Sequence, residues 1–125
     1  MDKAWEAVRE FHRAFGAPVS DRPTLLEPGR VAARADWMRE EVDELVEATC
    51  IAEQADAMID LIYFALGTLV EMGVRPQALF DIVQEANMSK LWPDGKPHYR
   101  EDGKIIKPST WIDPAPLLKS EIERQ

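Results

Sequence analysis

Apolar residues recur every three or four positions along most of the chain, the spacing of an amphipathic α-helix. The first such stretch begins near residue 3 and ends at Gly16, and its apolar positions are Trp5, Val8, Phe11 and Phe15. The segment 18–29 is rich in proline and predicts a loop. A second helix is predicted over roughly 31–49, with an apolar face formed by Val31, Ala35, Met38, Val42, Leu45 and Val46.

Two further helices are predicted in the middle of the chain. The stretch 52–72 is apolar on nearly every side from Ala57 onward, so it is expected at the centre of a bundle. Gly73 ends this helix, and Pro76 suits the first turn of the next one. The fourth helix extends to about Lys90, and its apolar positions are Leu79, Phe80, Ile82, Val83 and Ala86.

The character of the sequence changes after Lys90. Asp-Gly-Lys occurs at 94–96 and again at 102–104, and each copy is a turn signal. This segment is expected to form a short β-turn arm or an irregular loop, followed by a last short helix over 114–124. The prediction is therefore an all-α protein with one domain over 1–125. A four-helix bundle forms its helical core at about 3–91, and an irregular, lysine-rich C-terminal arm covers about 92–125.

The net charge of −8 is concentrated in one fifth of the chain. Residues 36–60 contain one base, Arg39, and nine acids, whereas acids and bases balance in the remainder. An acidic protein of this kind is a poor candidate for binding nucleic acid or an anionic membrane surface. The same segment is well suited to holding divalent cations, and the basic residues of the arm suit a phosphorylated ligand.

Cysteine content and hydropathy argue against several further classes of protein. A single cysteine, Cys50, excludes an internal disulfide framework and a cysteine-based zinc site. The longest apolar stretch, residues 57–70, contains Asp60 and is too short to span a bilayer. The first residues do not resemble a signal peptide, so a cytoplasmic location is expected.

Carboxylates recur at helical spacing on the second and third predicted helices. Glu41 and Glu44 lie on one face, and Glu53, Asp56 and Asp60 share one stripe. If the two helices pack antiparallel, these carboxylates converge, and such a cluster requires a cation or raised pKa values. Oxygen ligands without cysteine or histidine favour Mg²⁺, with Mn²⁺ as a substitute.

An acidic helix face is usually just solvated, and this interpretation suits Glu40, Asp43 and Glu47. Asp60 differs because its neighbours are apolar on both sides, from Met58 to Phe64. A carboxylate in that setting either pairs with a base or binds a metal, and the third helix has no lysine or arginine.

Two acidic segments and two later ones resemble a known family. They are EEVDELVE at 40–47, DAMIDLIY at 56–63, EANMSKL at 85–91 and DGKIIKP at 102–108. Together they resemble the MazG-type all-α NTP pyrophosphohydrolases, which include phosphoribosyl-ATP pyrophosphohydrolase and the dimeric dUTPases. The last two segments are similar to the phosphoribosyl-ATP pyrophosphohydrolase-like branch. The resemblance covers about residues 5–112.

The family motif is E-x-x-E followed, after a gap, by E-x-x-D. Glu41 and Glu44 fit its first half. A literal E-x-x-D at 53–56 follows too closely, whereas the register ending at Asp60 has the expected spacing and apolar context but carries Ala57 in place of glutamate. We favour the second register, with Asp56 replacing the missing glutamate and Glu53 as an additional ligand or supporting group.

The resemblance implies hydrolysis of a nucleoside triphosphate between its α and β phosphates, giving the monophosphate and pyrophosphate. Two or more Mg²⁺ ions would hold the triphosphate oxygens and lower the pKa of the attacking water. Glu40 or Glu41 is the expected general base that orients this water.

The lysines of the last third of the chain are expected to contact phosphate oxygens not covered by metal, and they are Lys90, Lys96, Lys104 and Lys107. Asn87 is a candidate for hydrogen bonds to the sugar or base, and Trp111 or Trp92 for stacking on the base. His12 is a further candidate for base recognition. Each of these residues also has an ordinary interpretation as a surface, capping or packing residue.

Alternatives remain at this point. The substrate could be phosphoribosyl-ATP or dUTP, or the chain could be a non-catalytic helical module whose acidic face binds a basic partner. Four tryptophans and a very apolar third helix also predict self-association, as a homodimer or homotetramer.

Overall fold

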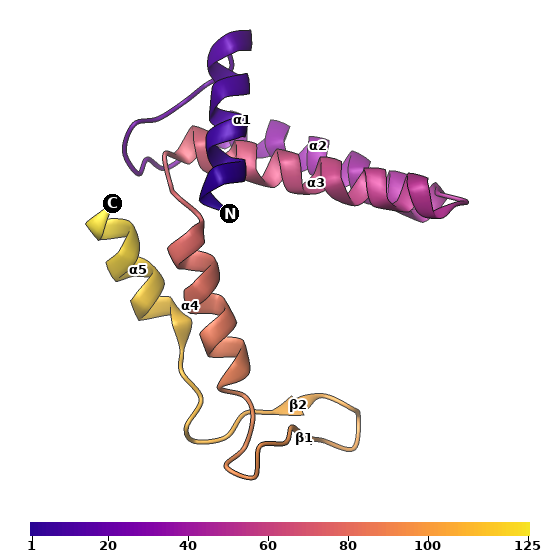
Figure 1. The fold of residues 1–125 in the computed structure, drawn as a ribbon, viewed down its shortest axis with the longest axis vertical. Helices are drawn as coiled ribbons and strands as arrows, with labels where there is room; N and C mark the ends of the chain where they lie inside the picture. The colour runs from indigo at the N-terminus through magenta and orange to yellow at the C-terminus, as the bar shows by residue number, and fades with distance from the viewer. The chain divides into compact units, whose positions relative to one another are not determined.

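The computed structural model describes all 125 residues, and they form two compact units, residues 1–76 and residues 77–125. Five α-helices account for most of the chain, and its only strands are two of two residues each, which form one hairpin (Figure 1). The predicted all-α fold is thereby confirmed. No single helix is long and apolar enough to cross a membrane.

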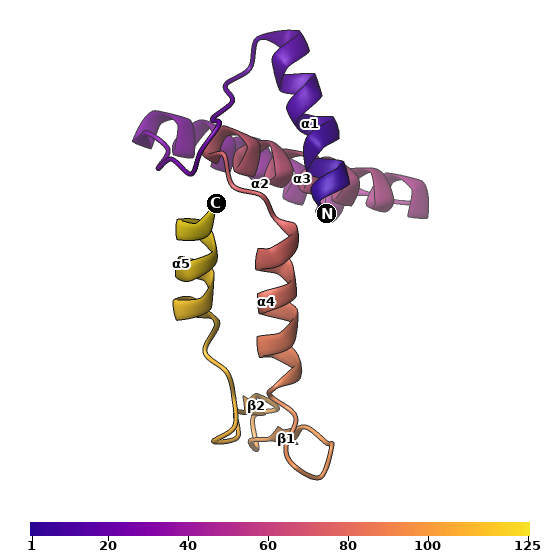
Figure 2. The same cartoon turned by 60° about the vertical axis from the view of Figure 1, so that its left-hand side comes forward.

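The first unit consists of three helices: α1 (Asp2–Phe15), α2 (Pro28–Glu47) and α3 (Ile51–Met72). α2 and α3 run antiparallel as a long hairpin, and α1 packs across α3, as both views show (Figures 1 and 2). α2 begins three residues before its predicted start because Pro28, with its fixed φ angle, occupies the first helical turn.

α1 and α3 enclose the apolar core of this unit. Trp5 and Val8 of α1 are buried against Leu66 and Val70 of α3. Two guanidinium groups flank the Trp5 ring, with the Cζ of Arg9 at 5.6 Å and that of Arg75 at 4.8 Å from its centroid. The single apolar core therefore lies at the C-terminal half of α3, and the distal half of the hairpin extends beyond it.

The loop between α1 and α2 closes the C-terminal end of α3. The backbone N–H groups of Ser20 and Thr24 donate to the carbonyls of Val70 and Met72, at 3.3 and 2.8 Å, which satisfies groups that a helix end leaves unpaired. Gly73 ends α3 with φ 67°, and a Cβ there would collide with the backbone of Arg22. The predicted end of this helix is thus correct, and only glycine fits it.

The second unit contains α4 (Gln77–Met88), β1 (His98–Tyr99), β2 (Ile105–Ile106) and α5 (Pro114–Arg124). α4 and α5 pack side by side (Figure 2). α5 matches the predicted last helix; Asp113 caps it by accepting a hydrogen bond from the Ala115 N–H at 3.0 Å.

Both Asp-Gly-Lys copies form the same turn. In each, the aspartate side chain accepts from the lysine N–H two residues later, at 2.9 Å in the first copy and 3.0 Å in the second, and the glycine has a positive φ. The second turn joins β1 to β2, so the arm is a short β-hairpin, which is the first of the two predicted forms. Trp92 secures it, because its Nε1–H donates to the Ile106 carbonyl at 2.9 Å and its ring stacks on His98.

Candidate metal centre

The packed faces of α2 and α3 form a seam along which side chains lie in a fixed order. The α2 positions are spaced by three and four residues and are Arg30, Arg34, Trp37, Glu41 and Glu44. Since α3 runs the other way, its matching residues are Glu71, Gly67, Phe64 and Asp60. The seam therefore has an arginine end, an aromatic middle and a carboxylate end.

At the arginine end, two guanidinium groups hold one buried carboxylate. Arg30 donates to both oxygens of Glu71, at 2.9 and 3.0 Å, and Arg34 donates to one of them. Burial alone raises the pKa of Glu71, but the hydrogen bonds and charges of Arg30 and Arg34 outweigh it and hold the pKa below its ordinary value. These residues tie α2 to α3 and satisfy each other.

His12 of α1 joins this network and is buried. Its Nδ1 donates to the Pro18 carbonyl at 2.8 Å, since a carbonyl can only accept. Its Nε2 accepts from Arg34 at 3.2 Å, since a guanidinium can only donate. Both ring nitrogens are therefore engaged within the fold, which leaves neither for the base contact that the sequence suggested.

Gly67 makes the contact between His12 and Arg34 possible. A Cβ at this position would lie 2.9 Å from an Arg34 nitrogen and 2.9 Å from His12 Nε2. Two side chains from α1 and α2 thus meet directly over the backbone of α3. Any larger residue would have to displace buried, hydrogen-bonded groups.

The aromatic middle consists of Trp37 and Phe64, whose ring centroids are 6.0 Å apart. Both arginines also approach the Trp37 ring, with Cζ to centroid distances of 5.2 Å for Arg34 and 5.6 Å for Arg30. These distances are within the range of cation–π attraction.

At the carboxylate end, Glu41, Glu44 and Asp60 each offer one oxygen, and the three oxygens lie within 4.8 Å of one another. Glu41 is buried, with 9% of its surface exposed, and its Oε2 has no hydrogen-bond partner. A buried, unpartnered oxygen beside two more carboxylates is an arrangement that can hold a cation. The donors are all hard oxygens, so they fit Mg²⁺ or Mn²⁺.

The electrostatics of Glu41 agree with this geometry. A hydrogen bond with Glu44, burial, and the negative charges of Glu44, Asp60 and Asp56 raise the pKa of Glu41 to about 7. The pair Glu41–Glu44 thus holds a proton near neutral pH. A cation that binds here has to release that proton.

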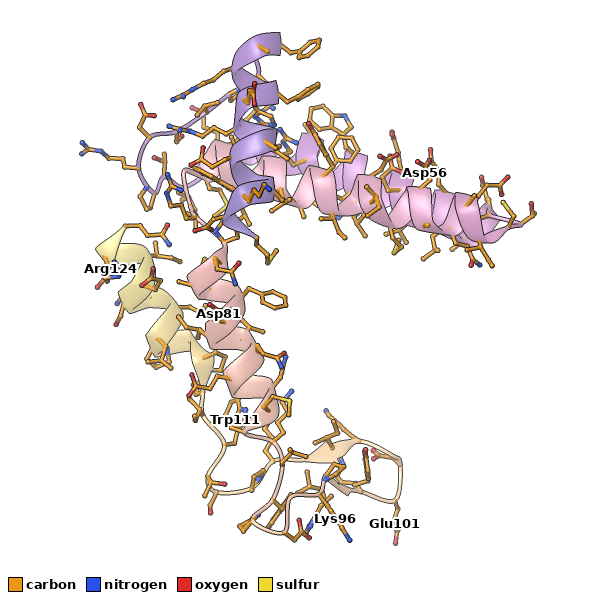
Figure 3. All side chains as sticks on the ribbon, in the orientation of Figure 1. Asp56, Asp81, Lys96, Glu101, Trp111 and Arg124 are labelled. Atoms are coloured by element: carbon orange, nitrogen blue, oxygen red, sulfur yellow. The ribbon has the colours of Figure 1, made fainter.

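The geometry supports the register that ends at Asp60. Asp60 joins the three-carboxylate group, whereas Asp56 acts on Glu41 only through its charge and is exposed (Figure 3). Glu53 accepts hydrogen bonds from the backbone and hydroxyl of Thr49, at 2.7 and 3.2 Å, and so stabilises the start of α3. Glu40 is exposed on α2, outside the group.

Two comparisons with known proteins bear on this arrangement. The family model of phosphoribosyl-ATP pyrophosphohydrolase matches residues 8–87. The chain belongs to this family.

A solved relative is consistent with that membership. It is a candidate NTP pyrophosphohydrolase from Exiguobacterium sp. 255-15, 33% identical, with a TM-score of 0.56; the match covers 98% of this chain and 95% of that one. Among curated proteins, none matches the sequence significantly. The predicted resemblance to MazG-like all-α NTP pyrophosphohydrolases is therefore confirmed, and pyrophosphohydrolase activity, the hydrolysis of a phosphoanhydride bond, is supported.

The region that matches the pyrophosphohydrolase family runs from α1 to α4 and includes Glu41, Glu44 and Asp60. The hairpin arm and α5 lie beyond it. Three of the predicted phosphate-binding lysines therefore lie in the arm, outside the matched residues: Lys96, Lys104 and Lys107. The fourth, Lys90, lies just beyond the end of the matched region.

Some residues of the second unit that were predicted to bind the ligand contact neighbouring side chains in the structure. Lys107 places its Nζ 4.0 Å from the centroid of the Trp111 ring, so this face of the ring is already covered (Figure 3 marks Trp111). Asn87 is exposed near the end of α4, and Lys96 and Lys104 are exposed in the two turns. Ser89, from the same motif as Asn87, is structural: its hydroxyl donates to the Ala86 carbonyl at 2.7 Å and accepts from the Ile112 N–H at 2.9 Å.

Sequence reasoning missed the arginine end of the seam. A signal was present, because Glu71 lies among apolar residues of α3 just as Asp60 does. Arg30 and Arg34 are one turn apart near the start of α2 and could have been matched to it. The antiparallel pairing that placed Asp60 beside Glu41 also places Glu71 beside the arginines.

Proposed function

We propose that this protein is a divalent-metal-dependent nucleoside triphosphate pyrophosphohydrolase. It hydrolyses a ribo- or deoxyribonucleoside triphosphate between the α and β phosphates, so that one water is consumed and a monophosphate and pyrophosphate are released. The observation that carries the proposal is the buried Oε2 of Glu41, which has no partner and faces two more carboxylates. Membership of the pyrophosphohydrolase family supports it.

Glu41, Glu44 and Asp60 would hold Mg²⁺, with Mn²⁺ as a substitute, and Asp56 would add negative charge nearby. The bound ion would offset the charge of the phosphate oxygens and lower the pKa of the attacking water. The carboxylates bring no guanidinium or ammonium with them, because the charges that act on Glu41 are those of other acids. The site is complete only when a cation enters from solution.

Proton transfer falls to the first acidic pair of α2. Glu40 or Glu41 orients the attacking water and accepts its proton. Glu41 shares a hydrogen bond with Glu44, so a proton received there has a second carboxylate to stabilise it. Lys90, Lys96, Lys104 and Lys107 would neutralise phosphate oxygens, and Asn87 would bind the sugar or base.

The test is incubation with each of the common ribo- and deoxyribonucleoside triphosphates and Mg²⁺, with the products separated by chromatography. Monophosphate with equimolar pyrophosphate is the expected result. Orthophosphate alone would show that a different bond is cleaved, and no product from any nucleotide would favour a non-catalytic helical module. Asp43→Asn is the matched control for Asp60→Asn, since Asp43 is an exposed acid of the same segment outside the carboxylate group.

Phosphoribosyl-ATP is the second candidate substrate, because the matching family model bears its name. The bond cleaved would be the same, between the α and β phosphates of an adenine nucleotide. Adding phosphoribosyl-ATP to the panel separates the two possibilities. A kcat/KM for phosphoribosyl-ATP well above that for every plain triphosphate would favour the second candidate.

We also propose that the chain self-associates through the α2–α3 hairpin, as a homodimer or homotetramer. Apolar side chains of this hairpin are between 44% and 85% exposed, and they include Val42, Val46, Ile51, Ile59 and Ile62. So many exposed apolar side chains on one helical hairpin are typical of a chain that covers them in an interface. Light scattering on a sizing column should give a multiple of the 14.2 kDa chain mass, reduced by Ile59→Glu combined with Ile62→Glu. A wild-type chain that elutes as a monomer would contradict this.

A further inference from the structure

The seam places arginine side chains and the carboxylate group on the same helix faces. Only one layer of aromatic rings lies between the two. On α2, Arg34 and Glu41 are seven residues apart, roughly 10 Å along the helix axis. An extended arginine and a glutamate together are long enough to cover that distance. An arginine that reached Glu41 would act as a permanent cation in the site.

The charges at the arginine end favour such a movement. Arg30 and Arg34 face one carboxylate there, Glu71, so that end carries one positive charge in excess. The other end of the seam holds three carboxylates and no base. Opposite charges attract across this distance, and water screens the attraction less because Arg34 and Glu41 are both buried.

Trp37 occupies the position on α2 between the two ends. Arg34 rests on its ring, at 5.2 Å from the centroid, and Phe64 of α3 lies against it at 6.0 Å. The ring attracts the guanidinium by its quadrupole and, with Phe64, lies between Arg34 and Glu41 in the order of side chains along the seam. His12 accepts a further hydrogen bond from Arg34 and holds it from the other side.

We propose that Trp37 is a positioning residue that keeps Arg34 away from Glu41, so that the carboxylate end stays open to a divalent cation. The inference rests on the proposed function only in requiring that Glu41, Glu44 and Asp60 bind such a cation. Nucleotide hydrolysis is not needed to test it.

The experiment measures Mn²⁺ binding to the full chain from the electron paramagnetic resonance signal of the free ion. The variants are Trp37→Ala, Trp37→Phe, Arg34→Met and the double variant Trp37→Ala/Arg34→Met. Trp37→Ala should weaken binding by about 10- to 100-fold, the usual effect of removing a group that orients a metal site from outside. Trp37→Phe should stay close to wild type because it keeps a ring in place.

The double variant decides between blocking and simple loss of structure. If Arg34 invades the site in Trp37→Ala, removing its charge restores Mn²⁺ binding to near the level of Arg34→Met alone. Loss of binding that the second substitution does not restore, or unchanged binding in Trp37→Ala, overturns the proposal. Should Trp37→Ala unfold by circular dichroism, Trp37→Leu replaces it in the same comparison.

Wild-type binding separates this inference from the proposed function. Absence of Mn²⁺ binding by the wild type, or equal binding by wild type and Glu41→Gln, would remove the metal site and the proposed function with it. Wild-type binding that Trp37→Ala leaves intact would remove only the role of Trp37.

Discussion

Glu41 shares a hydrogen bond with Glu44, one turn further along α2, and this contact is the main reason that the pKa of Glu41 rises to about 7. Two carboxylates this close repel each other when both are charged, so one of them keeps its proton up to about neutral pH unless a cation lies between them. The proton they share marks the place where a metal ion would bind. The stability of the protein should therefore depend on pH and on metal together.

Because its pKa is higher in the folded protein than in the unfolded chain, Glu41 contributes stability that is fully present below about pH 4.5. That contribution is lost as the pH rises toward 7. In thermal unfolding experiments with EDTA, the Tm of the wild type should fall across this pH range. The Tm of Glu41→Gln should lack this fall. Mg²⁺ should raise the Tm more at pH 8 than at pH 5, since at pH 5 it has to displace a proton. Equal shifts at both pH values would contradict the assignment.

Asp60→Asn should abolish turnover while leaving the helical content unchanged, because it removes a charge without altering shape. The kcat is expected to fall by about 100-fold or more, as for loss of a group that acts on the developing charge. Asp43→Asn, the exposed control on α2, should keep wild-type kcat. Full activity in Asp60→Asn would show that the site lies elsewhere.

The other two predicted ligands on α3, Asp56 and Glu53, should have different effects when they are substituted. Asp56→Asn should lower activity, since Asp56 acts on Glu41 through its charge. Glu53→Gln should lower activity less than Asp56→Asn does. It should also lower the stability of the fold, because Glu53 holds the start of α3 through Thr49. Steady-state kinetics and thermal unfolding of both variants test this. The reverse order of activity would restore the literal E-x-x-D motif as the ligand pair.

The helices and the central carboxylate could be predicted from sequence because each depends on local pattern. Asp60 stands out within one helix, where an apolar run offers no polar face to hold a charge. Gly73, which ends α3, is an equally local signal. Pairing with the second helix then followed from one assumption, antiparallel packing.

Other features depend on contacts between distant residues, which a local pattern does not pair even where one partner, such as Glu71, stands out. Arg30 and Glu71 are 41 positions apart, and His12 meets Arg34 only because Gly67 leaves room above α3. Nothing in the sequence around His12 or Gly67 indicates that His12 and Arg34 make this contact. Likewise, two Asp-Gly-Lys turns predicted reversals of the chain, but only the β1–β2 pairing shows which one forms the hairpin.

Gly67→Ala should destabilise the protein although alanine favours helices, because the new Cβ would collide with the Arg34 guanidinium and the His12 ring. The expected loss is about 1 to 3 kcal/mol in the free energy of unfolding, typical of overpacking. Gly29→Ala is the matched control in α2, where a Cβ meets nothing within 4 Å, and it should be neutral or stabilising. Urea titrations of both variants provide the measurement. A loss in Gly29→Ala as large as that in Gly67→Ala would argue against the collision.

Glu71→Gln should be the most damaging of the conservative changes, because it leaves Arg30 and Arg34 beside each other with no negative charge. Removing one partner of a buried ion pair usually costs about 3 to 5 kcal/mol. Since the pKa of Glu71 is lowered in the folded state, its contribution is present above the unfolded pKa and disappears as the pH falls through the folded value. The stability difference between wild type and Glu71→Gln should therefore shrink toward acid pH. Glu10→Gln, an exposed change on α1, should show no such loss at any pH. A difference between wild type and Glu71→Gln that stays constant into the acid range would mean that the charge of Glu71 is not what holds the arginines.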